Sequence, residues 1–267
     1  MTPTPVSDPT VTGMHASRPD ILVRGTGPTL LLAHGAGGGV VENFGLVLDD
    51  LARDHTVIGP HLPGAGGRPR STGPLDLDTV ADELIAAADG PVTILGESLG
   101  SAVAIRAAVR HPDRVTALVL TAGFAVADPV LDVTFELAQA LHGRPALRSA
   151  MLVAACITET ELSEMTPAEL HAAGGEGPPG LPEHVDLVRR VDVRADLAAV
   201  RARTLVVVPT GDRLVLPSSG RALADGIRDA ELVELSGAGH VLGAADRATW
   251  LGHVRAFLAA APGRVAA

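Results

Sequence analysis

The amino-acid sequence predicts an α/β protein with a mostly parallel sheet and a helical insertion. Short apolar runs alternate with segments of helical periodicity, which is the pattern of parallel strands joined by crossover helices. Two of the runs, residues 29–34 and 204–209, are apolar throughout, as expected of strands that helices cover on both faces. Between about Phe124 and Val200 the strand signals stop and helical patterns remain.

Each predicted element follows from such a run. Strands are expected at 29–34, 55–59, 91–96, 115–121, 204–209 and 230–235, with an edge strand at 20–25. Helices are expected between them at 40–54, 75–89, 99–112 and 247–261, and Pro112 ends the third. In the last helix the side chains of Trp250, Val254, Phe257 and Leu258 fall on one face.

The helical segment at 124–200 is expected to form a cap. It contains helical patterns at 131–143, 166–173 and 182–200 and a glycine- and proline-rich break at 174–182. Inserted after a strand, it would cover the carboxyl ends of the sheet as a lid. The predicted core is then 21–123 together with 201–263, and residues 1–20, rich in proline and threonine, are expected to be a flexible leader.

Composition excludes several classes of function. The net charge is −10 and the chain has four Phe, one Trp and no Tyr, so no nucleic-acid partner is expected. The single cysteine, Cys156, excludes an internal disulfide and is expected to be a small buried apolar side chain. Neither a membrane-spanning stretch nor a signal peptide is recognisable, so a cytoplasmic protein without a membrane partner is expected.

The strongest chemical signal is the stretch Gly96-Glu97-Ser98-Leu99-Gly100, which follows a predicted strand and opens a predicted helix. A nucleophilic serine in such a G-x-S-x-G turn needs glycines on both sides, because the strand and the helix nearly touch there. The helix N-terminus would favour negative charge at the serine hydroxyl. Taken alone, the pentapeptide also fits an ordinary structural turn.

A serine nucleophile requires a base that takes its proton. His240 follows the last predicted strand and Asp212 the strand before it, so both are expected at the sheet edge where Ser98 stands. The order Ser98, Asp212, His240 is the one that G-x-S-x-G folds use, with the acid orienting the imidazole. Asp128 or Asp132, after the strand at 115–121, are alternative acids.

A glycine-rich stretch, "HGAGGG" at 34–39, directly follows the strand at 29–34. Its backbone N–H groups suit a developing oxyanion, and the candidate donors are Ala36 and Leu99, with Gly37 as an alternative. Gly37, His34 and His61 are candidate substrate contacts; His34 is also expected to support this loop, and a structural role for His61 is equally open. This chemistry needs no metal and no organic cofactor.

Together these features resemble the α/β-hydrolase superfamily. "HGAGGG", "HLPGAG", "GESLGS", "TGDRLVLP" and "GAGH" stand at the expected places across roughly residues 21–261. The resemblance implies a Ser–Asp–His triad, an eight-stranded mostly parallel sheet and a helical cap after the sixth strand. Relatives commonly read Asp-Leu-Pro-Gly-His-Gly where this chain has "HLPGAG" at 61–66, so no subfamily is assigned. The missing Tyr and the serine nucleophile argue against epoxide hydrolase and haloalkane dehalogenase activity.

The predicted function is hydrolysis of a carboxylic ester or related acyl bond in a small, mainly apolar substrate, through an acyl-enzyme intermediate on Ser98. Two alternatives stay open. The same scaffold also serves C–C hydrolysis, lyase, perhydrolase and natural-product cyclase chemistry, and it also occurs as a ligand-binding protein that has lost catalysis. The sequence does not indicate an oligomeric state.

Overall fold

The computed structural model describes residues 20–141, 143–175 and 177–260. Its sheet has the strand order β1-β3-β2-β4-β5-β6-β7. The strands are β1 (Ile21–Arg24), β2 (Thr29–Ala33), β3 (Thr56–Pro60), β4 (Val92–Glu97), β5 (Val115–Thr121), β6 (Arg203–Pro209) and β7 (Glu231–Leu235). Strand β1 runs antiparallel to β3, and every other pair is parallel. The predicted α/β class with a mostly parallel sheet is confirmed.

The predicted number of strands was wrong for the described part of the chain, where the sheet has seven strands and not eight. The seven are those that the apolar runs indicated, whereas the eighth rested on the resemblance alone. Strand β1 already occupies the place beside β3, with Ile21 opposite Pro60. The helical insertion accordingly follows the fifth strand, β5, and not the sixth.

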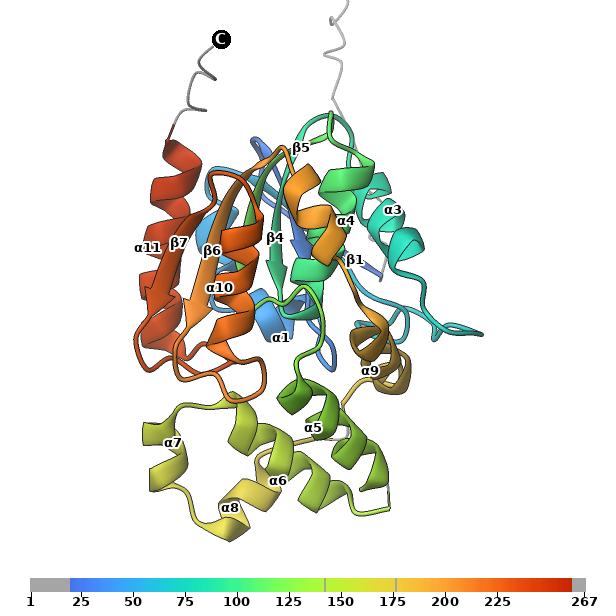
Figure 1. Cartoon of the computed structure of the whole chain (residues 1–267), viewed down its shortest axis with the longest axis vertical. Helices are drawn as coiled ribbons and strands as arrows, with labels where there is room; N and C mark the ends of the chain where they lie inside the picture. Colours follow the sequence, from blue (N-terminus) through green and yellow to red (C-terminus); the bar gives the residue numbers. More distant parts are fainter. Residues whose placement is uncertain (1–19, 142, 176, 261–267) are drawn as a thin grey trace, which may run out of the picture.

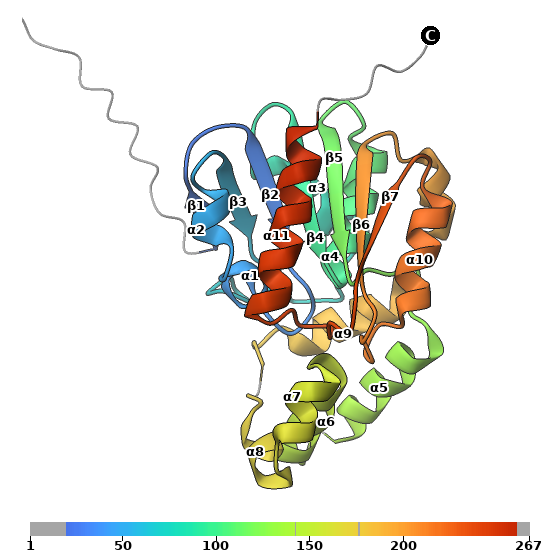
Figure 2. The same cartoon turned by 90° about the vertical axis from the view of Figure 1, so that its left-hand side faces the viewer.

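Helices cover both faces of the sheet (Figures 1 and 2). One face carries α1 (Val40–Phe44), α2 (Leu48–Leu51) and α11 (Ala244–Ala259); the other carries α3 (Leu77–Ala86), α4 (Leu99–Arg110), α10 (Pro217–Gly226) and the 3₁₀ helix η1 (Arg194–Ala199). Leu31 belongs to the apolar core of the α4 side, and its neighbour Leu32 belongs to the core of the α11 side. Successive strand residues point to opposite faces, which explains why β2 is apolar from Leu30 to Ala33.

One predicted helix is divided in the structure, and the buried face predicted for another is present. The helix expected at 40–54 is divided into α1 and α2, and Gly45 stands at the C-cap of α1. Glycine is a poor helix residue, so a break at this position is understandable. The face predicted for the last helix is present in α11, where Trp250, Val254 and Phe257 are buried.

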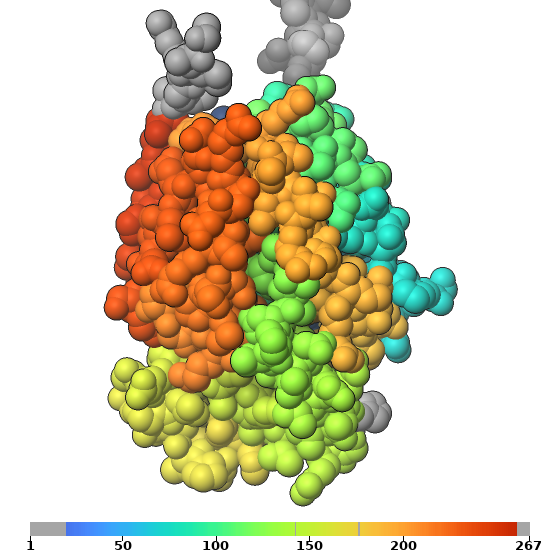
Figure 3. Space-filling view, viewed as in Figure 1, coloured from blue at the N-terminus to red at the C-terminus, as the bar shows by residue number. Residues whose placement is uncertain are grey.

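In the described part of the chain, five α-helices lie between β5 and η1: α5 (Pro129–Ala140), α6 (Pro145–Cys156), α7 (Glu159–Glu164), α8 (Pro167–Ala172) and α9 (Leu181–Arg190), called here the cap helices. They stand beyond the carboxyl ends of the strands, at the bottom of Figure 1, and the space-filling view shows them packed against the core (Figure 3). Val193 N–H donates to the carbonyl of Ala125 at 2.8 Å, so the chain leaves and re-enters the core at one place.

The exact division at 124 and 200 stays a prediction. Residues 1–19 of the predicted leader and 261–263 of the predicted core lie outside the described residues. No helix in the described part is long and apolar enough to cross a membrane.

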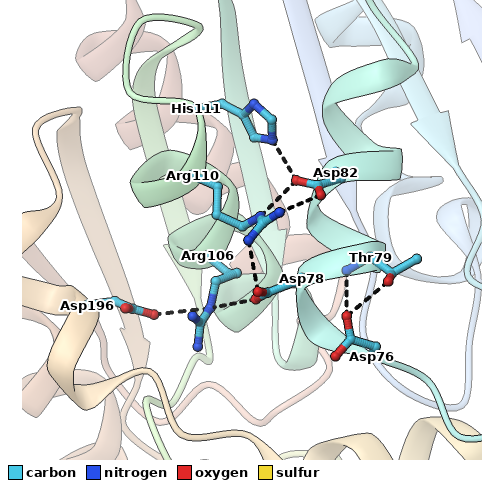
Figure 4. A network of polar contacts seen from close by, with 8 residues as sticks. All are labelled: Asp76, Asp78, Thr79, Asp82, Arg106, Arg110, His111 and Asp196. Atoms are coloured by element: carbon cyan, nitrogen blue, oxygen red, sulfur yellow. Dashed lines mark hydrogen bonds and ion pairs between the residues drawn. The ribbon is translucent and has the colours of Figure 1, made fainter.

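Ion pairs fix α4 against its neighbours (Figure 4). The Arg110 guanidinium contacts Asp78 at 2.8 Å and Asp82 at 2.6 Å, both on α3. One turn earlier, Arg106 lies between Asp78 at 3.4 Å and Asp196 of η1 at 3.2 Å. Helix α4 begins directly after Ser98, so these contacts help to hold the position of that residue.

Replacing Leu118 by alanine is expected to lower the free energy of unfolding by about 2–5 kcal/mol, because a cavity replaces a core side chain. Leu118 is 0% exposed in the centre of the sheet, whereas Leu232 on β7 is 44% exposed and serves as the matched control. Leu232→Ala is expected to change stability by about 0.5 kcal/mol or less. Urea unfolding followed by circular dichroism measures both variants, and equal losses would contradict the described burial.

Candidate active site

Ser98 stands at a strained junction between β4 and α4. Its backbone has φ 53° and ψ −121°, a conformation that L-residues rarely adopt, and its N–H donates to the carbonyl of Thr121 at 3.0 Å. A Cβ atom on Gly100 would lie 1.9 Å from the carbonyl oxygen of Ala33, and one on Gly96 would lie 2.5 Å from that of Gly100. The close approach of strand and helix therefore requires glycine at both positions.

His240 and Asp212 meet at the carboxyl ends of β7 and β6. His240 Nδ1 donates to Asp212 Oδ2 at 2.7 Å, since a carboxylate oxygen can only accept. The other oxygen of Asp212 accepts the N–H groups of Leu214 and Val215, each at 2.9 Å. Asp212 is 4% exposed and its carboxylate is fixed on both sides, so it holds the imidazole with Nε2 as the nitrogen available to accept a proton.

The pKa of His240 results from opposing influences. Burial is the largest and lowers the pKa, because it disfavours the charged ring. The charge and hydrogen bond of Asp212 and the charge of Glu97 act in the opposite direction and together raise the pKa above its ordinary value of 6.5. The neutral imidazole that accepts a proton therefore prevails only at a pH above this raised pKa.

The alternative acids are engaged elsewhere. One oxygen of Asp128 caps α5 by accepting two backbone N–H groups at 2.9 Å, and the other accepts from the hydroxyl of Ser219 at 3.0 Å. Asp132 pairs with an arginine of α9 at 2.6 Å. Of the three acids that the sequence offered, the structure places Asp212 against the histidine.

Two backbone N–H groups beside Ser98, those of Ala36 and Leu99, meet no acceptor among the described residues. Ala36 lies in the loop after β2, and Leu99 is the first residue of α4, where a helix leaves its N–H groups without partners. Gly37, the third candidate, donates its N–H to His184 Nδ1 at 3.4 Å and has φ +77°. Ala36 and Leu99 thus remain the two candidate donors to an oxyanion.

His34 and His61 lie behind this loop and do not line the cavity that Ser98 lines. His34 donates from Nδ1 to the carbonyl of Gly35 at 2.8 Å and accepts the N–H of Leu62 at Nε2 at 2.9 Å. Burial lowers the pKa of His34 to about 3, so the ring is neutral. His61 accepts the N–H that begins α1 at 3.4 Å. Substrate contacts of both histidines stay a prediction; the contacts that the structure describes are with the backbone of this loop and of its neighbours.

His184, on α9, did not stand out in the sequence. Its Nε2 donates to the carbonyl of Pro63 at 2.9 Å, and its Nδ1 accepts from Gly37. The side chain is fully buried, and burial lowers its pKa, which keeps the ring neutral as the accepting role requires. The histidine therefore ties the cap to the loop beside Ser98. Its position in the apolar stripe of α9, next to Val185 and Val188, was the signal that could have identified it.

A buried ion pair lies under the Ser98 turn. Arg247 of α11 donates to both oxygens of Glu97, one of them at 3.3 Å. Glu97 also accepts from the amide of Asn43 at 3.2 Å, and the Asn43 oxygen accepts the N–H of Gly35 at 3.2 Å. A chain of hydrogen bonds thus connects α11 to the loop that carries Ala36.

Ser98 and His240 line one cavity of about 810 Å³ between the core and the cap. Its apolar wall comes mainly from the cap: Phe135, Leu152, Val153, Ile157, Met165, Leu181 and, from the core, Leu214. Cys156 lines it as well, and burial raises the pKa of its thiol to about 12, so the thiol stays protonated. Within the described ranges no group of His, Cys, Asp and Glu side chains is arranged to hold a metal ion.

Comparison with known proteins agrees with this architecture. The family model of the alpha/beta hydrolase fold matches residues 28–154. The chain is 29% identical over 233 residues to a pyrrolizixenacetamide deacetylase from Xenorhabdus hominickii, covering 80% of this chain and 84% of that protein. It is 30% identical over 254 residues to a pimeloyl-[acyl-carrier protein] methyl ester esterase from Chromobacterium violaceum, covering 88% and 93%.

A crystal structure of a hydrolase from Pseudomonas aeruginosa PA01 superposes with a TM-score of 0.75 at 25% identity, covering 90% of this chain and 94% of that one. The similarity in sequence and in structure extends over both the sheet and the cap helices. The chain therefore belongs to the α/β-hydrolase superfamily.

Proposed function

We propose that this protein is a serine hydrolase that cleaves a carboxylic ester or related acyl bond of a small, mainly apolar molecule. The observation that carries the proposal is the 2.7 Å hydrogen bond between Asp212 and His240, whose imidazole lines the same cavity as Ser98. The similarity to proteins named as a deacetylase and a methyl ester esterase supports acyl chemistry.

In the proposed first step, the Ser98 hydroxyl attacks the carbonyl carbon and its proton passes to Nε2 of His240. Asp212 stabilises the imidazolium without taking the proton itself. The negative charge on the former carbonyl oxygen is held by the N–H groups of Ala36 and Leu99. The tetrahedral intermediate then collapses, the C–O bond to the leaving group breaks, and His240 returns the proton to the leaving oxygen.

The second step repeats this chemistry with water. His240 takes a proton from the water as it attacks the acyl-serine, and the acid is released when Ser98 regains its proton. One donor to an oxyanion is worth about 10²–10³ in kcat, so the two free N–H groups account for a large part of the expected rate.

The size and lining of the cavity favour a small substrate. Its volume, about 810 Å³, falls in the range of about 300–1,000 Å³ that small-molecule sites occupy. Aliphatic side chains prevail in the wall, and Phe135 is the aromatic residue among the described lining residues. An aliphatic acyl or alcohol group is therefore better accommodated than a stacked ring system.

Replacing Ser98 by alanine is expected to lower kcat on p-nitrophenyl butyrate by about 10⁴–10⁶-fold, because the covalent step is lost. Ser163→Ala, at an exposed serine of α7, is the matched control and should keep full activity. A fluorophosphonate probe should label the unmodified protein and the control but not Ser98→Ala. Unchanged turnover by Ser98→Ala would rule out the proposed function.

The pH dependence of kcat/KM should show an acidic limb above pH 6.5, because His240 must be neutral and its pKa is raised. Glu97→Gln removes a negative charge that raises this pKa and leaves the Arg247 cation uncompensated, so the limb should move to lower pH. Glu234→Gln, at an exposed acid of β7, should leave the limb unchanged. The profiles are measured at a temperature where circular dichroism shows folded protein, and a limb that moves upward in Glu97→Gln would contradict this electrostatic role.

A further inference from the structure

We propose that a side cavity in the cap binds an anionic group of the substrate, so that the preferred substrates are esters carrying a second, ionised carboxylate. This inference rests on the proposed ester hydrolysis at Ser98 and specifies its substrate class. The side cavity has a volume of about 290 Å³ and lies between α5, α6 and α9. It shares Phe135, Arg148, Leu152 and Leu181 with the cavity of Ser98, so the two cavities adjoin.

The lining of the side cavity combines one cation with an apolar wall. Its polar side chains among the described residues are Arg148 of α6 and Gln139 of α5. The others are Phe135, Ala138, Leu152, Leu181, Pro182 and Val185. The described lining contains no carboxylate, whereas the main cavity has Glu42, Glu161 and Glu164 in its wall. The two cavities therefore differ in charge.

Arg148 has neither a hydrogen-bond nor an ion-pair partner for its guanidinium among the described residues. Three other described arginines also lack a partner for the guanidinium: Arg144, Arg201 and Arg228. All three are exposed to solvent, whereas Arg148 is half-buried. Its guanidinium nitrogens are not among the buried unpaired atoms of the described residues, so an anion can reach them. A bound anion would supply the missing counter-charge.

The acids on the helices around the side cavity are directed to other arginines. Asp132 of α5 pairs with Arg189 at 2.6 Å, and Glu183 of α9 pairs with Arg70 at 2.8 Å. Glu136, the second acid of α5, lies within electrostatic reach of Arg189. These pairings leave the guanidinium of Arg148 available to a ligand.

A carboxylate matches the donors of this cavity. The planar guanidinium presents two parallel N–H groups to the two oxygens of a carboxylate, and the Gln139 amide offers a further donor. Because the side cavity adjoins the Ser98 cavity through a wall that includes Leu152, an aliphatic chain can connect the carboxylate to the ester carbonyl. The substrate class is thus a half-ester of an aliphatic dicarboxylic acid.

The test compares two series of p-nitrophenyl esters of equal chain length. One series consists of half-esters of the dicarboxylic acids from glutaric to suberic acid, and the other of esters of the matching monocarboxylic acids. The readout is the ratio of kcat/KM for the anionic ester to that for the neutral ester. At the best chain length this ratio should exceed one in the unmodified protein, and Arg148→Gln should lower it about 10- to 100-fold.

Arg144→Gln is the matched control, since Arg144 is an exposed arginine at the start of the same helix and lines neither cavity. It should leave the ratio unchanged, and Gln139→Ala should lower it less than Arg148→Gln does. A ratio of one or less at every chain length, or a ratio that Arg148→Gln does not lower, would overturn the subsite. Hydrolysis of the neutral esters tests the proposed function separately.

If neither series is hydrolysed, the proposed function fails, and calorimetric titration with adipate and suberate still tests the subsite. Binding to the unmodified protein and to Arg144→Gln, but not to Arg148→Gln, would support it. Equal binding to all three proteins, or no binding to any, would overturn it.

Discussion

The close approach of β4, α4 and β2 around Ser98 is the constraint on which the rest of the site depends. A side chain at position 96 or 100 would collide with backbone, and the turn keeps Ser98 in a backbone conformation that costs about 1–3 kcal/mol. Fully buried neighbours, Leu95 in β4 and Leu99 in α4, hold both elements in place. The packed sheet therefore maintains the strain that presents the serine hydroxyl to the cavity.

The buried polar side chains behind this turn orient the loop beside Ser98 more than they stabilise the fold. A buried ion pair loses hydration on folding, so Glu97 and Arg247 contribute little net stability, although breaking the pair costs about 3–5 kcal/mol. Their contacts orient Asn43 and through it the loop beside Ser98. Arg247 also stacks over Trp250 at 5.2 Å, whose indole N–H donates to the hydroxyl of Thr121 at 2.8 Å. The backbone carbonyl of Thr121 accepts the N–H of Ser98, so this second series of polar contacts also ends at the Ser98 turn.

Local pattern and topology account for what the sequence could predict. Strand periodicity located the sheet, and parallel strands bring the loops after β4, β6 and β7 to one edge, where Ser98, Asp212 and His240 stand. Contacts between distant residues escaped prediction. Glu97 and Arg247 are 150 positions apart, and Gly37 and His184 are 147 apart. Neither pair has a local signature, because each depends on how the cap and α11 pack against the core.

Helix α6 was missed for a different reason. Its alanine-rich sequence has no pronounced polar face, and it buries few side chains while lining a cavity, so hydrophobic periodicity gives a weak signal. Nothing in the sequence around Arg148 distinguishes its charge from that of a surface arginine. In the structure Arg148 lines a cavity together with apolar side chains of α5 and α9. Those side chains are too distant in the sequence for a local pattern to include them.

The exposure of α7 and α8 has a consequence for how such a protein diverges. Neither helix has a buried residue, yet Glu161, Glu164 and Met165 belong to the wall of the cavity. Substitutions at exposed positions usually change stability by about 0.5 kcal/mol or less, so this part of the wall can vary without endangering the fold. Selection can therefore alter which molecules fit at this side of the cavity while the sheet, the Ser98 turn and its supporting hydrogen bonds stay as they are.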